Sequence, residues 1–569
     1  MINRYPRRFT VLSGFIVLFA CIIIARLFYL QVVLGSQYAS VADRQFTKSA
    51  ATLYDRGSIY FRQKDGSRIS AATLQSGFVV VINPARINDP QSVYKSLSQI
   101  VPIDKDQYTQ KVNKKTDPYE EIATRVPEEL AQKIQSLKIA GVSVERERWR
   151  FYPGETLAAH ILGFVGFLGD ALVGRYGIEQ EFEAVLARGE DSLYSNFFAE
   201  VFSGLRKHIF LNATAQEGDV VLTIEPNVQT YLETELKNVL NTWHADQAGG
   251  IIINPKTGEI FAMAARPDFN PNNYGEASGN AFKNPLVQDV FELGSIMKPL
   301  TMAAGIDTGA VTAASTYDDK GFLVLNEKRI ANYDGKGRGV VNMQEVLNQS
   351  LNTGAAYVAL KMGKENFRDF MYAYGLGEKT GIDLPGEVSG LTDNLESTRD
   401  VEYATAAFGQ GIAVTPIEMV RALSSLANGG NLIKPHVVAS ITHPYALTET
   451  RETIEQGRVI KPETSEEVTR MLVQVVDKAL AGGNVSLPHY RVAAKTGTAQ
   501  ISDPVHGGYY EDRYLHSFFG YFPAYDPQFL VFLYMVNPKG IRFASETLTH
   551  PFFNITKYLI SYYNIAPDR

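Results

Sequence analysis

The chain contains 569 residues, with a formal net charge of −6 at pH 7 and a pI near 5.9. This length is sufficient for two or more packed domains, and an acidic balance without a long basic stretch excludes nucleic acid as the expected partner. The single cysteine, Cys21, excludes an intramolecular disulfide framework and a thiolate metal site. The nine histidines show no ligand spacing, and no glycine-rich phosphate loop is present. We therefore expect a protein without a metal or another cofactor.

The N-terminus is predicted to form a membrane anchor. Residues 9–25 carry no charge, and apolar character resumes after Arg26 as far as Leu34. As a tilted helix, residues 9–34 can cross a hydrocarbon core about 30 Å thick. The preceding residues 1–8 contain three arginines and no acidic residue, which predicts a cytoplasmic tail and export of the rest. A cleaved signal peptide is the alternative, but its apolar region would be long and no Ala-x-Ala site follows promptly.

Residues 36–217 are predicted to form a separate, non-catalytic domain. Short apolar strands alternate there with charged loops, as in residues 76–82 followed by Asn83 and Pro84. No catalytic constellation appears in this region. The charge-rich stretch over residues 105–125 is interpreted as a solvated helix pair rather than a binding face.

A new pattern begins at residue 218, where we place the domain boundary. Residues 220–224 are typical of a strand, and residues 228–240 have apolar side chains at helical spacing. Strand-like and helix-like segments then alternate in a βαβ-like order, up to an apolar strand over 529–536 and a helix over 552–563. This order predicts an α/β (α+β) domain over residues 218–569, with a central sheet flanked by helices.

Three short strings follow one another in this second domain: Ser-Ile-Met-Lys at 295–298, Ser-Leu-Asn at 350–352 and Lys-Thr-Gly-Thr at 495–498. A serine hydroxyl is a poor nucleophile at neutral pH, and a desolvated, neutral lysine can serve as its base. If a helix begins near Ser295, Lys298 lies on the same face within reach of the serine oxygen. Pro299 fits this placement because proline is tolerated in a first turn. The hydroxyl would then lie at the positive end of the helix dipole.

Each string alone is weak evidence, because the chain contains other copies. Lys-Thr-Gly also occurs at Lys256 and Lys379, and Ser-x-Asn recurs at Ser278. The copy at Lys256 lies between two apolar runs and is interpreted as a hairpin turn. The copy at Lys379 is interpreted as a surface loop. Only the copy at Lys495 follows both other strings and a strand-like run, so the order of the three carries the information.

The residue types suggest a role for each position. Ser295 is the expected nucleophile, Lys298 the general base, and Ser350 a hydroxyl that bridges them and relays a proton to the leaving amine. The Asn352 amide can bind the backbone of a peptide substrate. The Lys495 ammonium is expected to attract a terminal carboxylate and to disfavour protonation of Lys298. The remaining expected substrate-binding positions are Thr496, Gly497 and Thr498, whose threonine hydroxyls can hydrogen-bond that carboxylate.

The ordered strings resemble those of the serine acyltransferases that include penicillin-binding proteins and serine β-lactamases. Within that group the chain is similar to class B penicillin-binding proteins over nearly its whole length. It departs from the family pattern at Leu293, usually proline, at Ala494, usually glycine, and at Phe61, usually aspartate. Further landmarks that resemble the family are Arg-Gly-Ser-Ile-Tyr at 56–60, Arg-Phe-Tyr-Pro at 150–153, Ala-Ala-His-Ile-Leu-Gly at 158–163, Gly-Ile-Glu at 177–179, Leu-Thr-Ile-Glu-Pro-Asn-Val-Gln at 222–229, Gly-Gln-Gly-Ile at 409–412 and Ala-Asn-Gly-Gly at 427–430.

The resemblance implies a penicillin-binding transpeptidase fold preceded by an elongated pedestal or dimerisation-type domain and one transmembrane helix. It implies a monofunctional D,D-transpeptidase that cleaves the D-Ala-D-Ala end of a peptidoglycan stem peptide and passes the acyl group to an amine of a neighbouring stem. β-Lactams would acylate Ser295, and the backbone N–H groups of Ser295 and Thr498 would form the oxyanion hole. The expected location is the cytoplasmic membrane, single-pass, with the catalytic domain outside. The expected partners are a multi-pass membrane glycosyltransferase and divisome proteins.

Several alternatives stay open at this point. Asn352, where the elongation type has aspartate, and the compact length favour the division or septal type over the elongation type. A D,D-carboxypeptidase or a β-lactamase-type hydrolase would share the three strings, but the anchor and the large non-catalytic region argue against both. A β-lactam sensor or a scaffold for wall assembly would not be an enzyme. A sensor needs transmembrane helices that carry a signal inward, and only one is predicted.

Overall fold

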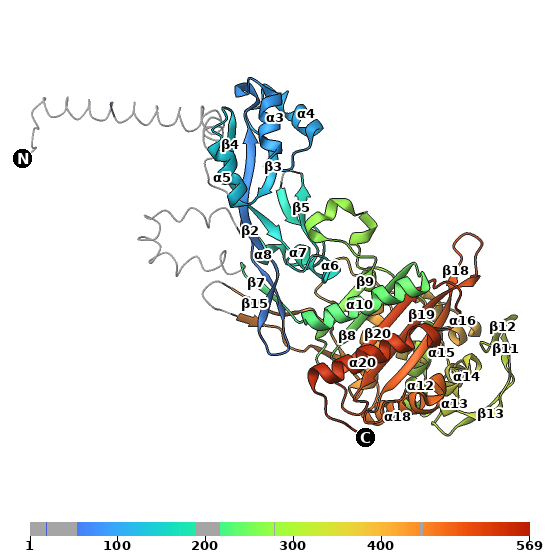
Figure 1. Ribbon diagram of the computed structural model, residues 1–569. Helices are drawn as coiled ribbons and strands as arrows, with labels where there is room; N and C mark the ends of the chain where they lie inside the picture. The colour runs from blue at the N-terminus through green and yellow to red at the C-terminus, as the bar shows by residue number, and fades with distance from the viewer. Residues whose placement is uncertain (1–18, 20–53, 170, 189–216, 278, 444–447) are drawn as a thin grey trace, which may run out of the picture. The chain divides into compact units, whose positions relative to one another are not determined.

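The computed structural model describes residue 19 and residues 54–169, 171–188, 217–277, 279–443 and 448–569 (Figure 1). The anchor predicted over residues 9–34 lies outside this part of the chain, apart from Phe19. Among the residues that are described, no helix is long and apolar enough to cross a membrane. The described chain forms two compact units. One consists mainly of residues 76–149, and the other of residues 56–75, 150–188 and 217–569.

The first unit combines helices with a small antiparallel sheet. Its elements are the second half of β2 (Arg68–Ile82), α3 (Pro90–Ser98), α4 (Lys105–Val112), β3 (Glu120–Val126), α5 (Glu128–Ser136) and β4 (Val142–Phe151). Strand β2 pairs with β3 in antiparallel register, and β4 also pairs with β2. Buried side chains of the sheet and the helices, such as Val80, Leu97 and Ile134, form one apolar cluster. The unit is therefore a mixed α/β body, with more helices than the strands, charged loops and single helix pair that the sequence suggested.

The predicted helix pair over residues 105–125 is wrong in its second half. Helix α4 ends at Val112, and the chain continues as strand β3 from Glu120. Pro118 disfavours a helical conformation for the residue before it. Beyond this turn the backbone forms ladder hydrogen bonds with β2, a pairing that a local charge pattern does not reveal.

The second unit is built around a five-stranded sheet with the order β18-β19-β20-β8-β9. These strands are β8 (Gln247–Ile253), β9 (Ile260–Arg266), β18 (Ala493–Ser502), β19 (Tyr509–Phe522) and β20 (Phe529–Val536). All four pairings are antiparallel, so the βαβ-like order predicted for this region is wrong. Continuous apolar runs are typical of parallel strands covered on both faces, and here an antiparallel sheet is covered in the same way.

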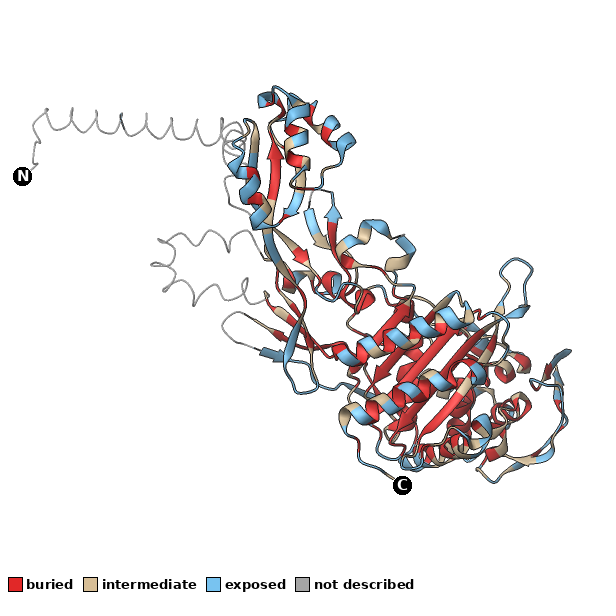
Figure 2. Cartoon of the chain, in the orientation of Figure 1, coloured by how far each residue is buried: buried red, intermediate tan, exposed pale blue. Residues whose placement is uncertain are grey.

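Helices cover both faces of this sheet (Figures 1 and 2). Along β20, Val531 and Leu533 contact the cluster formed with α10 (Pro226–Trp243) and α20 (Thr549–Tyr563), whereas Phe532 contacts the opposite cluster. That opposite cluster includes α12 (Lys298–Asp307), α14 (Asn352–Met362), α17 (Pro416–Ala427) and α18 (Pro462–Gln474). Successive side chains of a strand point to opposite faces, so an unbroken apolar run such as β20 can be buried on both faces. The predicted central sheet with helices on its faces is confirmed, as are the strand over 529–536 and the two predicted helices, which lie within α10 and α20.

A buried ionic cluster in this unit joins several of the sequence landmarks. Glu179 is fully buried, and its two carboxylate oxygens accept hydrogen bonds from Arg56 Nε and Arg150 Nε, each at 2.6 Å. The Tyr152 hydroxyl donates to the same carboxylate at 3.1 Å. A buried carboxylate is tolerated only when it is paired in this way. These landmarks therefore have a structural role, distant in sequence from the three strings.

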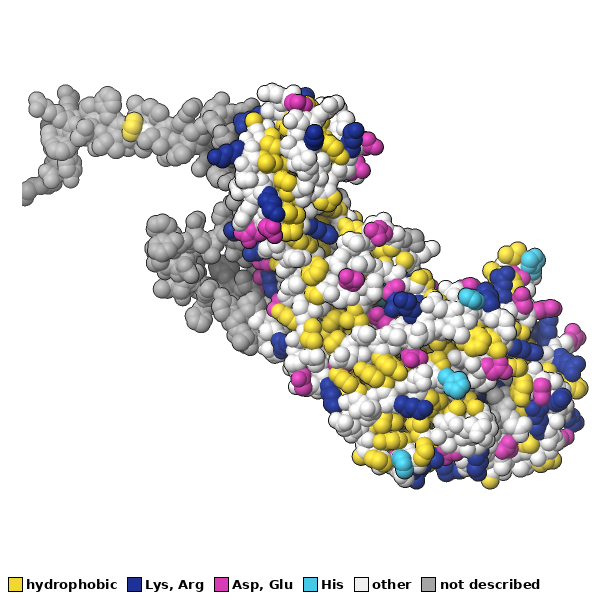
Figure 3. All heavy atoms as spheres, viewed as in Figure 1, with side chains coloured by type: hydrophobic (Ala, Val, Ile, Leu, Met, Phe, Trp, Pro, Cys, Tyr) yellow, Lys and Arg dark blue, Asp and Glu magenta, His cyan; other side chains and the backbone are white. Residues whose placement is uncertain are grey.

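On the face shown in Figure 3, acidic and basic side chains are interspersed.

Candidate active site

The first predicted position, Ser295, lies in a tight turn that leads into a helix. A 3-10 turn, η6 (Gly294–Met297), continues directly into α12, with Pro299 in the first turn. The expected helix start near Ser295 is thus observed, although its first turn is 3-10. Gly294 has a φ of +64°, which favours glycine. A Cβ at this residue would also lie only 2.8 Å from the carbonyl oxygen of Thr498, so the segment before Ser295 lies tightly against β18.

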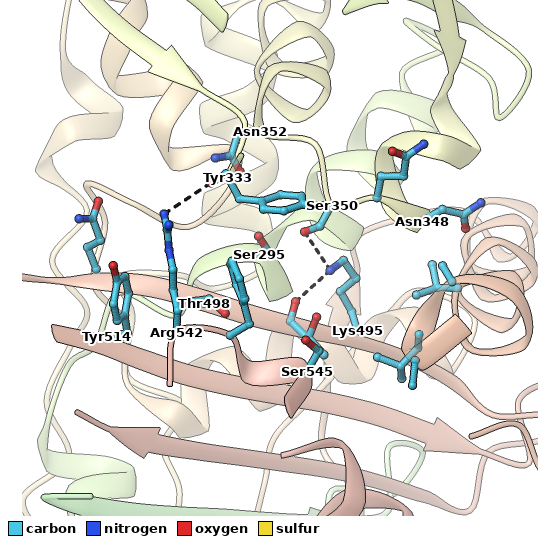
Figure 4. A pocket seen from close by; sticks show the side chains of 18 of the residues that line it. Ser295, Tyr333, Asn348, Ser350, Asn352, Lys495, Thr498, Tyr514, Arg542 and Ser545 are labelled. Atoms are coloured by element: carbon cyan, nitrogen blue, oxygen red, sulfur yellow. Dashed lines mark hydrogen bonds between the residues drawn. The ribbon is translucent and has the colours of Figure 1, made fainter. Parts of the chain in front are cut away.

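Two lysines meet at the hydroxyl of Ser350. Lys298 Nζ donates to Ser350 Oγ at 3.2 Å and to the Ser350 carbonyl oxygen at 2.5 Å. Lys495 Nζ donates to the same Ser350 Oγ at 3.0 Å (Figure 4). The sequence predicted that Ser350 would bridge Ser295 and Lys298, and the structure shows that its hydroxyl lies between Lys298 and Lys495. Ser350 is held in the left-handed region, with φ +55°, a strained conformation typical of functional sites.

The two lysine side chains are nearly inaccessible to solvent, at 1% and 2% exposure. Burial lowers the pKa of Lys298 well below its usual value, and the nearby Lys495 charge lowers it further. Burial also lowers the pKa of Lys495, to about 7. No carboxylate is bonded to either amine among the described residues, so two ammonium charges cannot easily coexist here. A neutral Lys298 beside Lys495 is the state that this environment favours at neutral pH.

Asn352 stands at the start of α14 and closes the cluster from the helical side. Its Oδ1 accepts from Lys298 Nζ at 2.8 Å, and its Nδ2 donates to the carbonyl oxygen of Ala331 at 2.9 Å. The next residue, Thr353, donates to the buried carboxylate of Asp319 at 2.8 Å. Asp319 also accepts from Asn332 Nδ2 at 3.0 Å. No sequence motif predicted this polar network, which connects Asn352 to the loop that contains Tyr333.

Strand β18 forms the edge of the central sheet and presents the third string to the cluster. Lys495 and Gly497 are buried, whereas Thr496 and Thr498 are partly exposed and line a cavity that also contains Ser295. Gly497 is required by close approach, because a Cβ there would lie 2.2 Å from Ser517 Oγ and 2.6 Å from the Leu293 carbonyl oxygen. The structure brings all eight predicted site residues to one place.

The two other Lys-Thr-Gly copies lie elsewhere. Lys256 lies in the turn between β8 and β9, where its ammonium pairs with Asp526, as the hairpin interpretation predicted. Lys379 is exposed in an irregular loop, also as predicted. In that loop the hydroxyl of Thr380 donates to the Glu387 carboxylate at 2.6 Å, so this threonine has a structural partner.

The cavity has a volume of about 470 Å³. Sequence reasoning missed a group of its lining residues, because they come from segments that carry no motif and meet only in the folded chain. These residues are Tyr333, Gln500, Tyr514, Arg542, Phe543 and Ser545. Gln410 also lines the cavity and belongs to the Gly-Gln-Gly-Ile landmark at 409–412, for which the sequence suggested no role. A serine at a helix start, a buried lysine three residues later and a second cation on an edge strand form an arrangement typical of a serine acyltransferase that uses lysine as its base.

Comparison with known proteins agrees with this class. The description "Penicillin binding protein transpeptidase domain" matches residues 248–556, and "Penicillin-binding Protein dimerisation domain" matches residues 54–196. The chain belongs to the penicillin-binding protein transpeptidase family.

Two relatives are similar over almost the whole chain. Stage V sporulation protein D of Bacillus subtilis is 32% identical over 552 residues, which cover 95% of this chain and 83% of that protein. Peptidoglycan D,D-transpeptidase FtsI of Escherichia coli is 26% identical over 577 residues, which cover 100% of this chain and 93% of that protein. Among solved structures, penicillin binding protein 2X from Streptococcus thermophilus has a TM-score of 0.72 at 20% identity, covering 91% of this chain and 81% of that one. This last likeness shows the fold.

Proposed function

We propose that the chain is a serine-type peptidoglycan D,D-transpeptidase that cross-links stem peptides through an acyl-enzyme on Ser295. The observation that carries the proposal is the contact of two buried lysines with one serine hydroxyl, beside a second serine at a helix start. Relatives named peptidoglycan D,D-transpeptidase and the match to the transpeptidase domain support the same activity.

The chemistry follows from the protonation state of the cluster. Neutral Lys298 accepts the Ser295 proton while Ser295 Oγ attacks the carbonyl carbon of the penultimate D-alanine. The bond to the last D-alanine then breaks, and its amine leaves with a proton relayed through the Ser350 hydroxyl. An amine of a second stem peptide attacks the resulting ester and releases Ser295, which completes the cross-link. Backbone N–H groups of Ser295 and Thr498 stabilise the oxyanion in both steps.

Lys495 has a separate role in substrate binding. Its ammonium attracts the terminal carboxylate of the stem peptide, and the hydroxyls of Thr496 and Thr498 donate hydrogen bonds to that carboxylate. Thr498 Oγ1 already accepts from the backbone N–H of Ala544 at 3.0 Å, which orients its own O–H towards another acceptor. Asn352 uses one of its two amide N–H groups on Ala331, and the other is available for the substrate backbone. A β-lactam mimics the D-Ala-D-Ala end and remains on Ser295 as a stable ester.

We further propose that the N-terminal part of the chain anchors the enzyme in the membrane, next to the cell wall. We assign residues 1–8 to a cytoplasmic tail, 9–34 to a membrane anchor, 36–217 to a non-catalytic pedestal and 218–569 to the transpeptidase domain. The anchor is expected to keep the protein in the membrane after an alkaline wash, with protease sites beyond residue 36 accessible from outside only. Recovery of the protein in soluble form, with a new N-terminus beyond Leu34, would contradict this assignment.

The division type is the favoured sub-type, acting in septal wall synthesis with a multi-pass membrane glycosyltransferase and divisome proteins. Its support is the Ser-Leu-Asn-Thr-Gly sequence from Ser350 and the similarity to proteins named FtsI. A role in sporulation is the second candidate, because the relative at 32% identity carries that name. Depletion in growing cells distinguishes them. Filaments without septa are expected for the division type, normal division for a sporulation role, and rounded cells would indicate the elongation type.

Covalent labelling by a fluorescent penicillin tests the catalytic assignment. Ser295→Ala and Lys298→Ala are expected to abolish labelling, through loss of the nucleophile and of the base. Lys495→Ala is expected to slow it at least tenfold, because charge-assisted contacts contribute about 1.5–3 kcal/mol. Lys256→Ala and Lys379→Ala are matched controls from the same tripeptide and should label at the normal rate. Undiminished labelling of the Ser295 variant would refute the assignment.

A further inference from the structure

The cavity beside Ser295 carries positive charge without a compensating acid. Among the residues that line it, the only charged side chains are Lys495 and Arg542, and no aspartate or glutamate is present. Lys495 already has an assigned partner, the terminal carboxylate of the stem peptide. Arg542 has none in the reaction as described above. A cavity with two cations and no anion is complementary to a ligand that carries two negative charges.

The position of Arg542 is set by the sheet beneath it. Its carbonyl oxygen accepts from Nε2 of the fully buried His516 at 3.0 Å. Two residues further on, the Ala544 N–H donates to Thr498 Oγ1. His516 lies directly opposite Thr498 in the β18–β19 pairing. The backbone of Arg542 is therefore attached to the same point of β18 that is proposed to bind the substrate.

The guanidinium of Arg542 is directed over the cavity by aromatic neighbours. It lies 5.8 Å from the ring centroid of Tyr514 and 5.4 Å from that of Phe543. Within the described chain its side chain donates one hydrogen bond, a long contact of 3.4 Å to the Tyr333 carbonyl oxygen, and it forms no ion pair with a described aspartate or glutamate. The planar donors of this arginine remain available for a carboxylate, which arginine binds with two parallel hydrogen bonds.

Lys495, Ser295 and Arg542 line one cavity. In the view of Figure 4, Ser295 lies between Lys495 on one side and Arg542 with Tyr514 on the other. The terminal carboxylate at Lys495 belongs to the D-alanine that leaves. The part of the stem that becomes attached to Ser295 lies on the other side of the cleaved bond, and we place it along the opposite end of the cavity, which Gln500, Tyr514 and Arg542 line.

We infer that Arg542 binds a second carboxylate of the donor stem peptide, on a residue upstream of the D-Ala-D-Ala end. This inference rests on the proposed transpeptidase function and adds a specificity to it. Donors with a free carboxylate at this place are preferred over donors in which it is amidated. Because Arg542 is exposed, the expected preference is about five- to tenfold and not the larger factor of a buried pair.

Three synthetic donors with the sequence of a stem peptide ending in D-Ala-D-Ala test the inference. The first has 2,6-diaminopimelate before the two alanines and all its carboxylates free. In the second, the diaminopimelate side-chain carboxylate is an amide, and in the third the α-carboxylate of the preceding γ-linked glutamate is an amide. The rate of D-alanine release at subsaturating donor is measured with the detergent-solubilised full-length chain. The donor whose amidation slows the reaction identifies which carboxylate Arg542 binds.

Arg542→Gln is expected to reduce this preference to about one, and Arg542→Lys to leave a smaller preference than in the unaltered chain. Arg513→Gln is the matched control. Arg513 is an exposed arginine on β19, next to Tyr514, and it does not line the cavity. Its preference should be unchanged. Equal rates for all donors with the unaltered chain, or an equal slowing of all donors by Arg542→Gln, would overturn the inference. D-Alanine release that persists in Ser295→Ala would instead refute the proposed function itself.

Discussion

The low pKa of Lys495 predicts a stability effect whose size depends on pH. Burial lowers the pKa of Lys495 to about 7 in the folded chain, whereas a lysine in the unfolded chain keeps the ordinary pKa of 10.5. Between about pH 7 and pH 10.5 the unfolded state therefore binds more protons, and the destabilisation by the buried lysine, which is full below this range, is lost as the pH rises through it. Since one pKa unit corresponds to about 1.4 kcal/mol, the cost is about 4 kcal/mol at pH 7 and about 2 kcal/mol at pH 9.

Lys495→Met removes this cost and keeps an unbranched side chain that is only one heavy atom shorter. The free energy of unfolding of the variant, minus that of the unaltered chain, should fall by about 2 kcal/mol between pH 7 and pH 9. Loss of the hydrogen bonds to Ser350 and Thr496 shifts both values by a constant, about 1 kcal/mol for each bond. The Lys495 charge also lowers the pKa of Lys298, so its removal makes the burial of Lys298 less costly and stabilises the variant further.

The assay is denaturant unfolding of the purified full-length chain at several pH values, followed by intrinsic fluorescence. Lys379→Met is the control, because Lys379 is exposed in a loop and its replacement should give a difference that does not change over this range. Penicillin labelling of Lys495→Met should fall at least tenfold in parallel. A stability difference that stays constant or grows from pH 7 to pH 9 would refute the view that Lys495 is a desolvated cation.

Three further predictions follow from the site and its support. Gly497→Ala should slow penicillin acylation at least tenfold, because the added Cβ would displace the Leu293 carbonyl just before Ser295. Gly275→Ala is the control and should have no effect, because a Cβ at that residue would meet open space. Glu179→Ala should lower the free energy of unfolding by about 3–5 kcal/mol, because the buried guanidinium of Arg150 loses its carboxylate and that of Arg56 loses one of the two carboxylates that it contacts, Glu179 and Glu183. Glu129→Ala at an exposed ion pair should cost less than about 1 kcal/mol, and equal losses would contradict the importance of the buried cluster. The second-order rate constant of acylation should decline above about pH 7 as Lys495 loses its proton. Lys495→Arg, which stays charged, should lack this decline. The same decline in Lys495→Arg as in the unaltered chain would argue against the carboxylate-binding role of Lys495.

The order of the three strings was sufficient to predict the centre of the site. Ser295, Lys298 and Ser350 lie in local structures whose signals are short in sequence: a helix start with proline in its first turn, and a serine next to a second helix start. The choice of Lys495 over Lys256 and Lys379 also came from order alone, and the structure places only Lys495 beside the serines. The continuous apolar run over 529–536 predicted a strand, and the structure confirms it as β20, which is buried on both faces.

The features that sequence reasoning missed depend on contacts between distant segments. The antiparallel direction of the central sheet could not be predicted, because residue periodicity is the same for parallel and antiparallel strands covered on both faces. Strand β3 was mistaken for a helix because its residues are charged and its stability comes from pairing with β2. Arg542 belongs to no motif, and its place at the cavity follows from a hydrogen bond to His516, 26 positions earlier.

The measurement that tests the central claim most directly is the fate of the acyl group on Ser295. The purified chain is incubated with a stem pentapeptide ending in D-Ala-D-Ala, with and without a second stem peptide that offers a free amine, and the protein and products are followed by mass spectrometry. The account predicts an ester mapped to Ser295, release of one D-alanine, and a cross-linked product that increases with the amine at the expense of hydrolysis. Hydrolysed tetrapeptide as the only product at every amine concentration, or an ester on a residue other than Ser295, would contradict it.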